Sequence, residues 1–133
     1  MSRLPRSQEH LKTGFAAEAK SAAQYRAFAA RAKRDGLEKL AAKWTELASE
    51  KDRLAILQLE AAGQVRGEQE DIAVALAEDY YENEILYPKM IREVSGDTAE
   101  VLRRVIDDQK KHIGELEELR EELQAAEGDI VPA

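Results

Sequence analysis

Four stretches of this sequence carry apolar residues at every third or fourth position, and a glycine or a short polar break separates each stretch from the next. This spacing is typical of one face of an α-helix, because a half-buried strand would alternate at every second position. The expected helices cover residues 7–35, 37–62, 69–94 and 97–126. The pattern therefore predicts an all-α fold, with the four stripes buried against one another in a single domain over residues 1–133.

Individual residues set the expected helix ends. Ser7 has the side chain of an N-cap for the first helix, and Gly36 suits a left-handed C-cap. The stretch of residues 63–68, which contains two glycines, breaks the apolar pattern and links the two halves of the chain. Pro88 lies inside the third expected helix, where its missing N–H predicts a kink about one turn earlier.

Polar residues interrupt each apolar stripe near its middle. The interruptions are Glu18 in the first helix, Lys51 in the second, Asp79 and Glu82 in the third, and Gln109 and His112 in the fourth. An antiparallel bundle would bring the four interruptions to one level of the core. Carboxylates there are costly unless a metal, a cation or a shared proton compensates them, so we expect a buried polar cluster.

Simpler interpretations exist for several members of this cluster. Lys51 could extend its ammonium group to solvent instead of pairing with a carboxylate. Asp79 could lie at the edge of its stripe, and His112 could be an ordinary core histidine. Tyr25 lies two turns after Glu18 and could donate a hydrogen bond into the cluster.

Composition excludes several classes of function. The formal charge is −7 and no basic stripe stands out, so no nucleic-acid partner is expected. The absence of cysteine excludes Fe–S clusters and thiolate zinc sites, and it fits a cytoplasmic protein. No apolar run reaches the roughly 18 residues of a membrane span, and the N-terminal residues lack the apolar core of a signal peptide.

Two segments resemble helices of the rubrerythrin branch of the ferritin-like di-iron proteins. Residues 14–25 (GFAAEAKSAAQY) look like the family's first helix, and residues 79–88 (DYYENEILYP) look like its third. The likeness covers about residues 8–125 and implies a ferritin-like antiparallel four-helix bundle. The rubredoxin-type iron module of full rubrerythrins is absent. The family relation implies a role in handling peroxide, oxygen or iron, as a non-haem metal oxidoreductase if the chain is an enzyme.

The resemblance also assigns metal-ligand positions. The family ligands that survive fall on Glu18, Asp79, Glu82 and His112. Lys51 and Leu54 stand where the second helix should supply a Glu-x-x-His pair, and Gln109 replaces the glutamate of the fourth helix. Both carboxylates that bridge the two metals in the family are thus replaced. A full di-iron centre is therefore not expected.

Two hypotheses follow for the remodelled site. The surviving carboxylates and histidine could hold one Fe, Mn or Zn ion, with Lys51, Gln109 and Tyr25 around it. Alternatively, the Glu/Asp, Lys and His side chains could pair with one another in a metal-free, non-catalytic bundle that acts through oligomer or partner binding.

The short link between the halves bears on assembly. In the ferritin-like topology the second and third helices run parallel, so their connection must climb the bundle by roughly 30 Å. Residues 63–68 span at most ~20–25 Å even when extended. We therefore expect a homodimer in which two chains exchange helix pairs.

Overall fold

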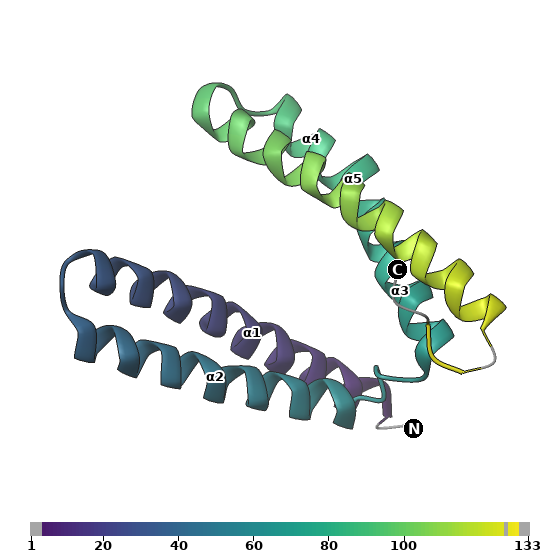
Figure 1. The fold of residues 1–133 in the computed structure, drawn as a ribbon, viewed down its shortest axis with the longest axis horizontal. Helices are drawn as coiled ribbons and strands as arrows, with labels where there is room; N and C mark the ends of the chain where they lie inside the picture. Colours follow the sequence, from purple (N-terminus) through teal and green to yellow (C-terminus); the bar gives the residue numbers. More distant parts are fainter. Residues whose placement is uncertain (1–3, 127, 131–133) are drawn as a thin grey trace. The chain divides into compact units, whose positions relative to one another are not determined.

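The computed structural model describes residues 4–126 and 128–130, with side chains from residue 6 onward. The elements within these ranges are all helices, which confirms the all-α prediction (Figure 1). In chain order they are α1 (Leu4–Arg34), α2 (Glu38–Ala61), α3 (Glu68–Tyr81), the π-helical segment η1 (Glu82–Leu86), α4 (Tyr87–Arg92) and α5 (Gly96–Ala125). The chain divides into two compact units, α1 with α2 and α3 through α5, and each is described by itself.

The helix ends follow local chemistry with one correction. Helix α1 begins at Leu4, so Ser7 lies inside the helix and the prediction that it is the N-cap is wrong. A proline is well tolerated in a first helical turn, because its missing N–H would have no intrahelical acceptor there, and Pro5 occupies that turn. Gly36 has a φ of 78°, and the N–H of Leu37 donates to the carbonyl of Ala32 at 2.9 Å. This left-handed glycine cap ends α1 as predicted.

Alanine forms the contact between α1 and α2. The residues of this unit that are buried are Ala22, Ala29, Ala32, Ala41, Ala48, Ala55 and Ala62. Their spacing in and just after α2 is seven residues throughout, which keeps them on one side of the helix. Small side chains allow the two helices to approach closely. A Cβ atom added at Gly14 would come within 1.7 Å of the Gln58 Oε1 atom, so the end of the glutamine side chain would have to shift.

The second unit pairs α3 and its continuation with α5 (Figure 1). Its buried residues are Leu76, Asn83, Ala99 and Ile113. The disturbance predicted before Pro88 takes the form of η1, in which the N–H of Tyr87 donates to the carbonyl of Glu82. Pro88 offers no N–H to the preceding turn, so the turn before it can widen to hold one extra residue. Within the described ranges, no helix is long and apolar enough to cross a membrane.

Candidate functional site

Glu18 and Lys51 form an ion pair between α1 and α2. Their Oε2 and Nζ atoms are 2.8 Å apart, and the side chains are 24% and 29% exposed. Lys51 lies one turn from both Ala48 and Ala55, which are buried between α1 and α2. The hydrogen bond to Glu18 raises the pKa of the Lys51 ammonium group, and desolvation opposes this rise in part. The lysine therefore pairs with the predicted carboxylate.

Tyr25 belongs to an aromatic cluster beside this ion pair. Its ring centroid lies 5.0 Å from that of Trp44, and the Phe28 ring lies 5.1 Å from the same indole. Among the hydrogen bonds of the described residues, none joins Tyr25 to Glu18. The Tyr25 hydroxyl nevertheless lies near enough to contribute to the raised pKa of Lys51.

Glu82 and Gln109 form the corresponding pair in the second unit. The Gln109 Nε2 group donates to Glu82 Oε1 at 2.8 Å. Asn83 is buried beside them, at 7% exposure, and its Nδ2 group donates to the carbonyl of Ile106 at 2.8 Å and to Gln109 Oε1 at 3.4 Å. Asn83 was not among the site residues predicted from the sequence. Its position seven residues after Leu76, on the same side of a helix, was the signal that could have found it.

Asp79 and His112, the other two predicted ligands, have no such partner among the residues that the structure describes. Asp79 is half-buried and His112 is exposed. Among the described residues, no three histidine, aspartate or glutamate side chains gather closely enough to hold a metal ion. The predicted residues are divided between the two units, so their union in one cluster stays a prediction. The first unit contains Glu18, Tyr25 and Lys51, and the second contains Asp79, Glu82, Gln109 and His112.

The side chains of Lys51 and Gln109 do not fit a di-iron centre of the kind found in the family that the chain resembles. A metal ligand must offer a lone pair. The Lys51 ammonium group has none, and it already neutralises Glu18. Gln109 turns its NH₂ group, a donor, toward Glu82. Glu18 and Glu82 therefore each bind a hydrogen-bond donor from the facing helix. The family that the chain resembles would have a second carboxylate at each of these donor positions.

A further hydrogen bond joins α3 to α5. The Tyr80 hydroxyl donates to Glu117 Oε1 at 2.5 Å. This bond raises the pKa of Tyr80, and desolvation acts in the same direction, because both disfavour the phenolate. The Tyr80–Glu117 bond thus gives α3 and α5 a further point of contact, about two turns along α5 from Gln109.

Comparisons of the chain with protein-family models, with curated proteins and with solved structures gave no match. The site is therefore judged on its own geometry.

Proposed function

We propose that this chain is a ferritin-like four-helix protein of the rubrerythrin type that works without a metal and acts by binding other chains. The ion pair between Glu18 and Lys51 carries the proposal. It places a fixed positive charge where the family's second-helix glutamate would bridge two metals. In this role the polar pairs set the register of the facing helices, as buried polar groups do in some coiled coils.

The apolar surface of each unit supports the binding part of the proposal. None of the large side chains described is fully buried, and alanine makes most of the buried contact between α1 and α2. Large apolar side chains are instead exposed on both units: Phe28, Leu37, Leu40, Ile56, Leu57, Val65, Val74, Tyr80, Tyr81, Ile85, Val94 and Val101. Burial of such surface is the main driving force for association. Each helix pair thus offers surface for a further helical layer.

The linker favours pairing between chains. Helix α2 runs ten residues beyond Lys51, to Ala61, and α3 begins eleven residues before Asp79, at Glu68. With Lys51 and Asp79 at one level and α2 parallel to α3, the link must recover roughly 30 Å along the axis. Residues 62–67 reach only ~23–25 Å when extended. In our proposal, α1 and α2 of one chain therefore complete a bundle with α3 through α5 of a second copy.

Metal analysis tests the first part of the proposal. Protein purified without chelators, and then loaded with Fe(II), Mn(II) or Zn(II), is expected to retain no stoichiometric metal after desalting. Tight binding of one ion that is lost in Glu82→Gln and His112→Ala would overturn the metal-free proposal in favour of a single-metal site. Light scattering tests the second part: the exchanged dimer has twice the 14.9 kDa mass of one chain.

A further inference from the structure

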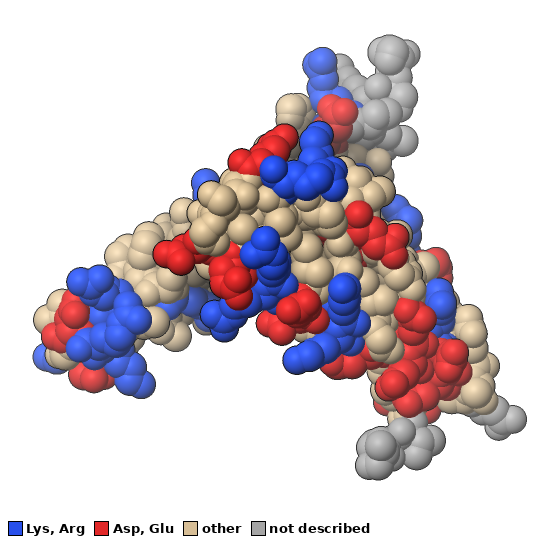
Figure 2. All heavy atoms as spheres, turned by 90° about the horizontal axis from the view of Figure 1, so that it is seen from above, with Lys and Arg blue, Asp and Glu red and all other residues tan. Residues whose placement is uncertain are grey.

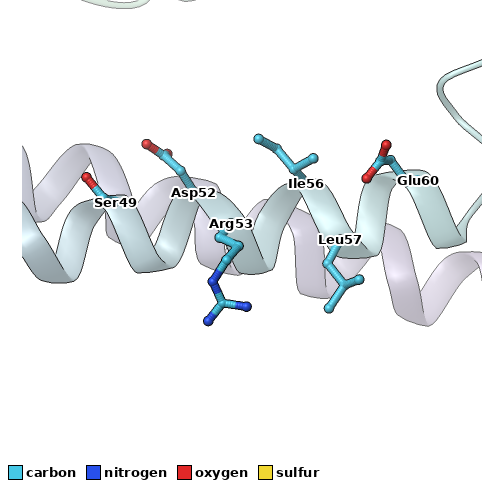
Figure 3. A pocket seen from close by; sticks show the side chains of 6 residues that line it. All are labelled: Ser49, Asp52, Arg53, Ile56, Leu57 and Glu60. Carbon is cyan, nitrogen blue, oxygen red and sulfur yellow. The ribbon is translucent and has the colours of Figure 1, made fainter.

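Helix α2 carries a second apolar surface that its contact with α1 does not use. Ala55 is buried between the two helices, whereas the next two residues, Ile56 and Leu57, are 53% and 58% exposed. At about 100° per residue, Leu57 points away from α1 and Ile56 points to one side of α2, so the two side chains extend in opposite directions in Figure 3. Both also lie off the stripe that contains Lys51 and Leu54. This surface is therefore separate from the one that would build a four-helix bundle.

Charged side chains flank the two apolar residues. The side chains that line the shallow hollow here all project from α2, as Figure 3 shows: Ser49, Asp52, Arg53, Ile56, Leu57 and Glu60. Asp52 forms an ion pair with Arg26 of α1. Arg53 and Glu60 are exposed, and no ion pair in the described part of the chain includes either. The apolar pair thus has one unpaired positive charge, Arg53, before it and one unpaired negative charge, Glu60, after it.

The positions of the two free charges are symmetric. Arg53 and Glu60 are seven residues apart, so their backbone positions lie on one side of the helix, and their exposed side chains extend from it in opposite directions in Figure 3. The midpoint between them falls between Ile56 and Leu57, about 5 Å along the axis from each charge. A two-fold axis perpendicular to the helix at this midpoint would place Arg53 of one copy opposite Glu60 of the other, and the reverse. This surface of α2 is therefore complementary to an antiparallel copy of itself, whereas a parallel copy would bring like charges together.

We propose that this face of α2, which we call the α2 dyad surface, binds the same face of a second copy of the chain. Arg53 pairs with Glu60 of the partner subunit on both sides of the axis, and Ile56 and Leu57 pack against the same two residues of the partner between these ion pairs. Figure 2 shows charges of both signs interspersed over the face of the molecule. Two copies therefore need opposite charges that meet locally in order to bind. The proposal does not depend on the bundle, because it uses the opposite side of α2.

Charge reversal tests the α2 dyad surface. In Arg53→Glu alone, or in Glu60→Arg alone, like charges face each other across the axis. A one-to-one mixture of these two variants restores both ion pairs in a heterodimer, and the double variant restores them in a homodimer. Lys39→Glu is the matched control, because it is an equal charge change on an exposed part of α2 that lies beyond the end of the partner helix. Helicity by circular dichroism checks that each variant folds.

Sedimentation equilibrium between ~10 μM and ~1 mM gives the readout, since a single helix pair is a small interface and binds weakly. The weight-average mass of the native chain and of Lys39→Glu is expected to rise with concentration. In each single reversal the same rise should need at least about tenfold more protein, and the mixture and the double variant should regain it. A native mass that does not change, single reversals that associate like the native chain, or a folded mixture that fails to associate would each overturn the proposal.

Discussion

The Lys51 ammonium group lies 2.8 Å from Glu18, at the position where the resemblance to rubrerythrins would place a metal-bridging glutamate. In the relation to rubrerythrins that we propose, a lysine thus stands in place of a metal ligand and supplies a counter-charge. The carboxylate of Glu18 lies between α1 and α2, and Lys51 of the same helix pair compensates its charge.

Loss of this counter-charge should destabilise the protein. We expect Lys51→Met to lower the free energy of unfolding in urea, because Glu18 would stay partly buried without a positive partner. Lys43→Met is the control, since the ion pair of Lys43 with Glu46 is 60% exposed on both sides and should matter less. Glu18→Gln should recover part of the loss in the Lys51→Met background. Equal stability of the two methionine variants would show that the pair does not compensate Glu18.

Stability should also fall at high pH. Lys51 and Tyr80 have folded-state pKa values above their ordinary values of 10.5 and 10.0. The folded state thus holds both protons more tightly than the unfolded state does, so the stabilisation is complete below pH about 10 and is lost as pH rises through the folded-state values. Urea denaturation from pH 8 upward should show this decline, and Tyr80→Phe should reduce it. An unchanged profile in Tyr80→Phe would contradict the role given to its bond with Glu117.

The alanine contact between α1 and α2 should not tolerate a larger side chain. Ala48 is completely buried. We expect Ala48→Leu to cost ~1–3 kcal/mol in thermal or urea unfolding, because the helices must separate to hold the added carbons. Ala42→Leu adds the same group on the exposed side of α2 and should change stability by less than about 0.5 kcal/mol. Equal effects of the two substitutions would mean that α1 and α2 do not meet at Ala48.

Restoring the family's ligands should create a metal site if the bundle forms as proposed. The variant with Lys51→Glu, Leu54→His and Gln109→Glu regains both Glu-x-x-His pairs. We expect it to bind Fe(II) or Zn(II) stoichiometrically, as measured by calorimetry, whereas the native chain does not. A version with Glu82→Gln added should bind less tightly. No binding by the restored variant, in protein that remains helical, would contradict the ferritin-like arrangement.

Linker length should control exchange between chains. Insertion of about a dozen flexible residues at Gln64 would let α3 return beside α2 of its own chain. We expect light scattering to show a shift from two chains per particle toward one. The same insertion with Arg53→Glu should remove any association that remains through the α2 dyad surface. A native chain that is already monomeric at micromolar concentration would contradict the exchange.

Much of the helical structure followed from the sequence. The 3.6-residue period fixed the helices, and the left-handed glycine at position 36 fixed the end of α1, because both depend on neighbouring residues alone. Glu18 and Lys51 could also be placed on apolar stripes before the structure was known. The helical start at Leu4 was not predicted, because serine is a common N-cap residue and the chain has one three residues later.

Other features depended on which helix faces which. The sequence predicted that apolar stripes face one another, but it did not show that alanines form the contact between α1 and α2, since backbone proximity is a property of the pair. The burial of Asn83 and the choice of Gln109 as the partner of Glu82 likewise require the facing turn of α5. Periodicity determines that a side chain lies on a face; only the tertiary structure decides what that face meets, because the energy of burying a polar group depends on its partner across the interface.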